Sequence, residues 1–315
     1  HLMRSSGGVA RAADAAALPV GLISSGPAAG VIGAARVAAA AGVRDALTID
    51  VEEWFHDDWR PDRGADWDRL PSTVATDVGL MLDLLAAAGA RATFFVLGDV
   101  ARRQPAVVKR IAAAGHEIAS HGDAHRKVAT QAPNEFSADV RTSLDVLSDL
   151  TGVEVAGYRA PYFLGHARDL WAIDVLAELG LRYDASYVPV RWMPYVGRSI
   201  PRAPYRHPCG LWEFPLPFAE RFGGWNLPYA GGGPMLRFLP YRLIDRSLRT
   251  HEAAVGSAVV YCHPWELDPV ARALPGTPRY VRLWKRLGRR RTLPTLRQLL
   301  AGFTFRSIRE VYADE

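Results

Sequence analysis

Short apolar runs alternate with amphipathic stretches along the chain from about residue 46 onward. The runs have the length and the β-branched and aromatic content of buried strands. The stretches between them carry apolar residues three and four positions apart, and several are followed by glycine, as at Gly89, Gly115 and Gly152, which is typical of helix ends. The predicted strands are 46–51, 92–97, 117–120, 157–162, 182–186 and 258–263, and the predicted helices are 72–89, 105–114, 134–150 and 168–179.

This alternation of strands and helices predicts an α/β protein with a parallel sheet built from β-α units. Chemically versatile residues fall at or just past the predicted strand ends. They are Asp50, His121, Arg159, Asp184 and His263. Functional groups of β/α barrels gather at the carboxyl ends of the strands, so we expect these side chains to meet there. Residues 187–257, rich in Pro, Gly, Trp and Tyr, are expected to form long loops and extra elements around a cleft.

Composition fits a folded protein with a sizeable core, because 49% of the 315 residues are hydrophobic and 23% are charged. The net charge is +5, and basic residues become denser near the C-terminus, in Lys285, Arg286, Arg289, Arg290 and Arg291. A solvated helix face explains such a cluster, and an anionic polymer or an acidic membrane surface are the sharper alternatives. No aromatic and basic motif accompanies the cluster, so a nucleic-acid partner is not expected.

The N-terminal residues 1–45, rich in Ala and Gly, are expected to be a leader ahead of a catalytic domain formed by residues 46–315. Residues 24–30 resemble a glycine-rich loop of hydantoinase-type proteins but lack the lysine of a P-loop. Pro19, Pro27 and Arg36 interrupt any apolar core of a signal peptide, so no clear signal peptide is predicted, and the compartment stays open between cytoplasm and cell envelope. No apolar run is long enough for a transmembrane segment.

Two cysteines, Cys209 and Cys262, lie far apart and do not make a disulfide framework. Cys262 stands inside an apolar run, so we expect it to be a small buried hydrophobic residue.

The strongest chemical pattern is the histidine pair His121 and His125, four residues apart. Such a pair can lie on one face of a helical turn and share a metal ion, and imidazole suits zinc and cobalt. A catalytic metal usually takes a third protein ligand, and the acids Asp50, Glu52 and Glu53 follow the first strand. Alternation along an extended chain places Asp50 and Glu52 on one face, so one could bind metal while the other accepts a proton. Helix capping is the alternative role for these acids.

Three further residues are candidates for supporting roles. Arg159 could hold an acid ionised and oriented, or form an ordinary structural ion pair. His263 ends an apolar strand, where a histidine is often a satisfied core residue. Asp184 could orient His263 through its second ring nitrogen.

Taken together, these segments resemble the polysaccharide deacetylase family, also called the NodB-homology or carbohydrate esterase 4 family. The resemblance covers residues 47–315 and is closest to the subgroup associated with exosortase and exopolysaccharide gene clusters. It rests on matches in order along the chain. They are Ile49-Asp50-Val51-Glu52-Glu53-Trp54-Phe55-His56, Ala92-Thr93-Phe94-Phe95-Val96-Leu97-Gly98, Tyr158-Arg159-Ala160-Pro161-Tyr162, Tyr183-Asp184-Ala185-Ser186, Trp212-Glu213-Phe214-Pro215, Gly231-Gly232-Gly233, Leu239-Pro240-Tyr241 and His263-Pro264-Trp265-Glu266. The last four belong to a family-specific C-terminal extension, about residues 205–315.

The resemblance implies a distorted barrel of about seven β/α units and a role for each matching residue. Asp50 matches the general base, and Arg159 matches the arginine that positions it. His121 and His125 match metal ligands. The backbone N–H of Tyr162 matches an oxyanion donor. His263 matches the general acid, and Asp184 its partner.

One departure from the family pattern concerns the third metal ligand. The common pattern has two adjacent acids after the first strand, but Val51 occupies the second place here. Members with a D-x-D spacing have their ligand two residues on, which maps onto Glu52, with Glu53 as the alternative.

The implied activity is metal-dependent removal of N-acetyl groups from an acetylated polysaccharide or oligosaccharide, with zinc, cobalt or another first-row metal as cofactor. Aromatic residues that could stack on sugar rings, or else pack in the core, are Trp192, Trp212, Trp225 and Tyr229. Two alternatives remain: a metal-free amidohydrolase acting on another amide such as a cyclic ureide, and a non-catalytic carbohydrate-binding barrel.

Overall fold

The structure, a computed structural model, describes residues 45–56, 67–164, 169–188, 201–216 and 231–312. It also describes the backbone of two short paired strands near the N-terminus, β1 (Leu2–Met3) and β2 (Val9–Ala10).

One mostly parallel sheet organises the described residues, in the order β10-β3-β4-β5-β6-β7-β9-β8, with β11 also pairing with β3. All pairings are parallel except that of β8 with β9. The strands are β3 (Asp45–Val51), β4 (Thr93–Val96), β5 (Glu117–Ser120), β6 (Gly157–Tyr158), β7 (Tyr183–Asp184), β8 (Tyr205–Arg206), β9 (Trp212–Glu213), β10 (Ala258–Cys262) and β11 (Phe305–Arg306). Each of the six predicted strands corresponds to one of these, with β3 beginning one residue earlier than predicted.

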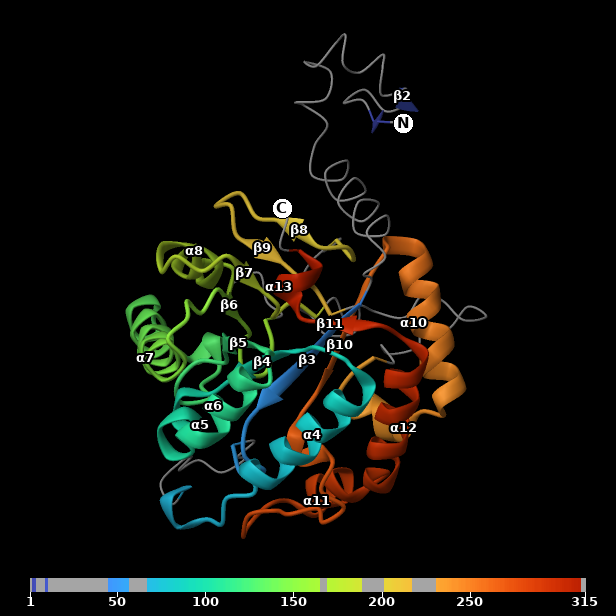
Figure 1. Cartoon of the computed structure of the whole chain (residues 1–315). Coiled ribbons are helices and arrows are strands. Elements are labelled where there is room, and N and C mark those ends of the chain that lie inside the picture. Colours follow the sequence, from blue (N-terminus) through green and yellow to red (C-terminus); the bar gives the residue numbers. More distant parts are fainter. Residues whose placement is uncertain are drawn as a thin grey trace.

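Helices pack around the sheet, with α7 and α8 beside β6 and β7, and α10 and α12 beside β10 (Figure 1). The helices are α4 (Val74–Ala88), α5 (Gly98–Arg103), α6 (Pro105–Ala113), α7 (Pro133–Thr151), α8 (Trp171–Glu178), α9 (Met235–Phe238), α10 (Tyr241–Val255), α11 (Arg279–Arg286), α12 (Arg289–Gly302) and α13 (Ile308–Val311). Short 3-10 turns are η1 (Trp67–Arg69), η2 (Val128–Thr130) and η4 (Pro264–Glu266). The four predicted helices correspond to α4, α6, α7 and α8.

Burial explains why the apolar runs became the central strands. All seven residues of β3 are buried, and so are all four residues of both β4 and β5. Strands covered on both faces are expected to be continuously apolar rather than alternating. Cys262, at the end of β10, is fully buried as predicted, and burial raises the pKa of its thiol.

The predicted fold class, a distorted β/α barrel, is confirmed. Within the described residues the sheet forms a half-barrel whose edges are β10 and β8. Segment 187–257, expected to form long loops and extra elements, contains the 15-residue helix α10 among its described residues. None of the described helices is both long and apolar enough to span a bilayer.

Candidate active site

Strand register brings the predicted residues to one end of the sheet. Val51, Val96, Ser120 and Tyr158 occupy equivalent positions on successive strands. The residues that follow them therefore emerge at the same level, and these include Glu52, His121 and Arg159. On the other side of β3, Cys262 pairs with Ile49, so the next residues, His263 and Asp50, are also neighbours.

Asp50 and Arg159 form a buried pair at this end. Arg159 Nη1 donates to Asp50 Oδ1 and to Thr48 Oγ1, at 2.8 Å each, and Nε donates to the Ala185 carbonyl at 2.9 Å. The guanidinium lies 4.2 Å from the ring centre of Phe95, and the residue is completely buried. These contacts fix one oxygen of the Asp50 carboxylate in place.

Glu52, His121 and His125 form a buried cluster in which one possible ligand atom from each lies within 4.8 Å of the others. His125 Nε2 is 2.5 Å from Glu52 Oε2. His121 Nδ1 donates to the Arg159 carbonyl at 2.8 Å, which leaves Nε2 as the nitrogen available to a ligand.

The two histidines meet on a loop and not on a helical turn, so that expectation was wrong. Residues 121–127 are irregular, and Gly122 (φ 76°) and His125 (φ 52°) adopt left-handed backbone conformations. Asp139 of α7 holds the loop by accepting hydrogen bonds from the N–H groups of Asp123 (2.8 Å) and Ala124 (3.3 Å). The two histidines, four residues apart, are therefore brought together by a tight loop.

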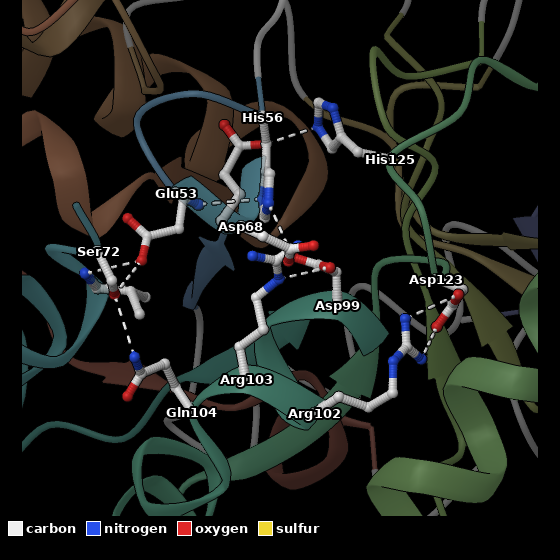
Figure 2. Close-up of polar contacts among 12 residues, drawn as sticks. Glu53, His56, Asp68, Ser72, Asp99, Arg102, Arg103, Gln104, Asp123 and His125 are labelled. Carbon is white, nitrogen blue, oxygen red and sulfur yellow. Dashed lines mark hydrogen bonds and ion pairs between the residues drawn. The ribbon is translucent and has the colours of Figure 1, made fainter. Parts of the chain in front are cut away.

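Glu53 performs a different task from Glu52. Its carboxylate accepts hydrogen bonds from Thr73 N (3.0 Å), Val74 N (3.4 Å) and the Ser72 hydroxyl. These groups lie at the start of α4, so Glu53 satisfies N–H groups that the helix leaves unpaired. Figure 2 shows Glu53 turned toward Ser72, while its own N–H donates to His56 Nδ1 at 3.2 Å.

His263 lies next to Glu52, with Nε2 3.5 Å from Glu52 Oε1. Its other nitrogen, Nδ1, is 3.2 Å from Glu266 Oε2, three residues along the chain. Glu266 is buried and faces Arg237, whose Nε is 3.6 Å from Glu266 Oε1. Glu266, rather than the predicted Asp184, is therefore the described carboxylate that contacts the second ring nitrogen of His263.

Asp184 is engaged elsewhere. Its carboxylate accepts from Ser186 Oγ at 2.5 Å and hydrogen-bonds to the neighbouring carboxyl group of Glu213. Glu213 Oε1 in turn accepts from Tyr187 N at 3.1 Å. Burial raises the pKa of Glu213 to about 8 and that of Asp184 well above its usual range, and the closeness of the two acids pushes the pKa of Asp184 further up. The pair therefore holds at least one proton at neutral pH.

Burial and charge pairing together set the pKa values of the residues around the cluster. Burial raises the pKa of Glu52, but the rings of His125 and His263 outweigh it and hold that pKa well below its usual range. Burial lowers the pKa of His121 to about 4. For His263 burial acts downward, yet Glu52 and Glu266 outweigh it and raise its pKa to about 9.

Backbone strain is concentrated at the same place. Within the described residues the non-glycine residues with positive φ are His125 (52°), Tyr162 (62°) and Phe163 (60°). Left-handed conformations cost free energy in such residues and persist mainly at functional sites. The Tyr162 ring lies 4.9 Å from the His125 ring and is partly exposed, so residues 160–163 form one wall of the site.

Of the four aromatic residues predicted to contact substrate, only Trp212 lies in the described part of the chain. Trp212 begins β9 and is half-buried, stacked on Phe214 at 6.3 Å and beneath the Arg206 guanidinium at 5.1 Å. Core packing thus accounts for Trp212. Trp192, Trp225 and Tyr229 lie outside the described residues.

Several residues that had no predicted role support the cluster from behind. Trp265 Nε1 donates to Glu52 Oε1 at 3.0 Å. His56, fully buried, stacks on His125 with ring centres 6.1 Å apart, and its Nε2 meets Asp99 Oδ2 at 3.1 Å. Figure 2 shows Asp99 between His56 and Arg103. His56, Trp265 and Glu266 lie in segments that match the family motifs, and those matches were the advance signal of a role.

The residues at this site suit a divalent cation. Glu52, His121 and His125 offer one carboxylate and two imidazoles, a donor set that zinc accepts. Glu52 Oε2 is buried and accepts no hydrogen bond of acceptable geometry within the described residues. The atom that approaches it, His125 Nε2 at 2.5 Å, is itself a candidate ligand, as expected of two atoms that would share a metal ion. The fold and site thus define a β/α half-barrel with an acid–arginine pair beside a cluster able to bind a cation.

Three segments of the chain match models of known protein families. Residues 66–183 match the polysaccharide deacetylase family model, and residues 185–313 match a domain of unknown function, DUF3473. Residues 1–51 match the hydantoinase/oxoprolinase model. The chain thus carries a polysaccharide deacetylase domain, as its motifs predicted.

Curated relatives are similar over part of the chain. A peptidoglycan-N-acetylglucosamine deacetylase of Bacillus cereus is 35% identical over 82 residues, which cover 26% of this chain and 30% of the relative. A chitooligosaccharide deacetylase of Bradyrhizobium sp. is 33% identical over 113 residues, covering 36% of this chain and 48% of the relative. The chain thus spans less than half the length of each.

Solved structures share the fold. One from Mycobacterium smegmatis, assigned to the polysaccharide deacetylases, matches with a TM-score of 0.58 at 22% identity, covering 85% of this chain and 87% of the other. The PuuE allantoinase structure matches with a TM-score of 0.54 at 15% identity, covering 85% and 88%.

Proposed function

We propose that this chain is a metal-dependent hydrolase that removes N-acetyl groups from a polysaccharide containing N-acetylhexosamine, such as an exopolysaccharide, and releases acetate. One observation carries the proposal. The Asp50–Arg159 pair, the Glu52–His121–His125 cluster and His263 all lie at the carboxyl end of the same strands. The arrangement supplies a proton acceptor, a cation site and a proton donor around one point.

Glu52, His121 and His125 would hold the cation, with zinc as the first choice. When bound, a divalent cation polarises a carbonyl group and lowers the pKa of water. Asp50, oriented by Arg159, would accept the proton of the water that attacks the acetamide carbonyl carbon. The backbone N–H of Tyr162 would donate a hydrogen bond to the developing oxyanion. His263 would protonate the leaving nitrogen as the C–N bond breaks, giving acetate and a free amino sugar.

The names of the relatives support this substrate class. They are a peptidoglycan-N-acetylglucosamine deacetylase and a chitooligosaccharide deacetylase. The site also draws on the segment that matches DUF3473, because His263, Trp265 and Glu266 all come from residues 185–313. We therefore assign residues 46–315 to one catalytic unit whose C-terminal extension completes the site.

Acetate release from N-acetylglucosamine oligomers tests the proposal, measured after chelation and again after adding zinc or cobalt. Release that stops on chelation and returns with metal is expected. Release that is indifferent to chelation, from metal-free protein, would contradict metal dependence. Hydrolysis of allantoin with no acetate release from any acetylated oligomer would favour the cyclic-ureide alternative.

Paired substitutions distinguish the two candidate third ligands. Glu52→Gln should abolish stoichiometric metal binding, because it removes a charged oxygen of the cluster. Glu53→Gln should leave metal content unchanged and lower the melting temperature, because it weakens the hydrogen bonds at the start of α4. Elemental analysis and thermal unfolding of both variants give the answer, and metal loss confined to Glu53→Gln would reverse the assignment.

A further inference from the structure

Helix α11 (Arg279–Arg286) exposes its apolar stripe to the outside. Tyr280 (69% exposed), Leu283 (58%), Trp284 (47%) and Leu287 (47%) follow one another at spacings of three, one and three residues. This is the spacing of a single helix face, and in a globular protein that face normally packs on the core. Here the inward positions are instead those of Val281 and Lys285.

The helix is held firmly in this orientation. Arg237, buried beneath it, donates through Nη1 to the carbonyl groups of Trp284 (2.8 Å), Lys285 (3.1 Å) and Leu287 (3.2 Å). These bonds satisfy carbonyls at the end of α11 that the helix itself leaves unpaired. The outward stripe is therefore a fixed feature of the surface.

The surroundings of the stripe are strongly cationic. From residue 269 to residue 309 the sequence contains eleven Arg and Lys residues and no Asp or Glu. Arg279, Arg282 and Arg286 are exposed, and together with Leu283 and Val270 they line a surface groove of about 830 Å³ formed with residues 269–273. Among the described residues, no acid forms an ion pair with these three arginines.

We propose that α11 and residues 269–273 form a docking surface for a bilayer that contains anionic lipids. Trp and Tyr side chains favour the membrane–water interface, and aliphatic side chains such as Leu283 and Leu287 partition into the acyl boundary. Arginines in the groove would bind the phosphate headgroups. A soluble anionic polysaccharide fits less well, because aliphatic side chains offer neither a flat face for a sugar ring nor a hydrogen bond.

The placement of this surface gives docking a consequence for the site. Helix α11 lies on the side of the molecule toward which β3 points (Figure 1). Lys285 Nζ is 5.8 Å from the ring of Trp265, which donates to Glu52. Docking through α11 would therefore hold the candidate active site beside the bilayer, whatever reaction it performs.

Flotation of the purified full chain with lipid vesicles tests the proposal. Binding is expected to vesicles of mixed phosphatidylcholine and phosphatidylglycerol and not to phosphatidylcholine alone. Each basic side chain near an anionic surface contributes about fivefold, so Arg282→Gln/Arg286→Gln should bind about 25-fold more weakly. Lys109→Gln/Arg141→Gln, which removes two exposed charges on α6 and α7, should bind like the unchanged chain.

The apolar stripe has its own test. Leu283→Ser/Leu287→Ser should lose the binding that survives high salt, because screening removes the electrostatic contribution and leaves the apolar one. Melting temperatures of all variants confirm folding. Equal losses in both charge variants, binding to neutral vesicles, or binding to a soluble anionic polysaccharide such as alginate without vesicle binding would each overturn the proposal.

Discussion

Replacing Glu266 with glutamine tests the contact that orients His263. Glu266 Oε2 lies 3.2 Å from His263 Nδ1 and also accepts the His263 backbone N–H at 3.2 Å. Glutamine keeps the shape of the side chain and removes its charge. The imidazole then loses the carboxylate that fixes its orientation and favours its protonated form.

The size of the effect follows from these contacts. Losing a carboxylate that supports a functional histidine typically costs 10- to 100-fold in activity, which is about 1.4 to 2.7 kcal/mol on the barrier. A stability loss is also expected, because the buried guanidinium of Arg237 loses its nearest anion. Arg237 keeps three carbonyl acceptors. We therefore expect the free energy of unfolding of Glu266→Gln to fall by roughly 2 kcal/mol, which is less than the 3–5 kcal/mol typical of a broken buried ion pair.

The assay measures kcat and KM for acetate release, with metal content and urea unfolding on the same samples. We expect kcat to fall while KM and metal content stay close to those of the unchanged protein. Asp184→Asn is the matched control, because it also replaces one buried acidic side chain with its amide, and its kcat should change little. A collapse of kcat in Asp184→Asn with normal turnover in Glu266→Gln would refute the assignment.

Three further predictions follow from the site. Asp50→Asn should lower turnover by about 10²- to 10⁴-fold with metal content unchanged, since it removes the proton acceptor; single-turnover kinetics and elemental analysis check both. His125→Ala should lose metal and activity together, and full metal occupancy would contradict its place in the cluster. Glu213 binds its proton in the folded protein up to a pKa of about 8, against an ordinary 4.5, so its contribution to stability is present below pH 4.5 and is lost as the pH rises toward 8. Glu213→Gln should therefore gain stability relative to the unchanged protein by a few kcal/mol between pH 5 and pH 8, measured by urea unfolding at each pH.

Six strands and four helices of the barrel could be predicted, because burial and helix termination both leave local signals in the sequence. Apolar runs mark β3, β4 and β5, which are buried on both faces. Gly89 and Gly152 mark the ends of α4 and α7, since both adopt the left-handed conformation that closes a helix (φ 60° and 70°).

Helix α11 could not be predicted with its orientation from the sequence, because its apolar side chains do not pack in the core. Its apolar stripe faces outward, and Arg237 rather than an apolar core determines its position. The basic residues of this segment are typical of a solvated helix face, but their relation to Tyr280, Leu283 and Trp284 depends on which side of the helix is buried. That side is decided by tertiary contacts.

Asp184 was predicted to orient His263, but its position in a motif does not tell which face of the sheet its side chain is on. Tyr158 precedes Arg159, and Asp184 pairs with Tyr158 in the sheet. Side chains alternate along a strand, so Asp184 shares the face of Tyr158 and not that of Arg159. Its neighbours Tyr183 and Ala185 pack with Phe95 on the Arg159 face. This alternation of side chains places Asp184 beside Glu213, the residue opposite it on β9.

Glu266, by contrast, lies three residues from His263 on one short turn, so its contact with the ring is local and could have been predicted from spacing alone.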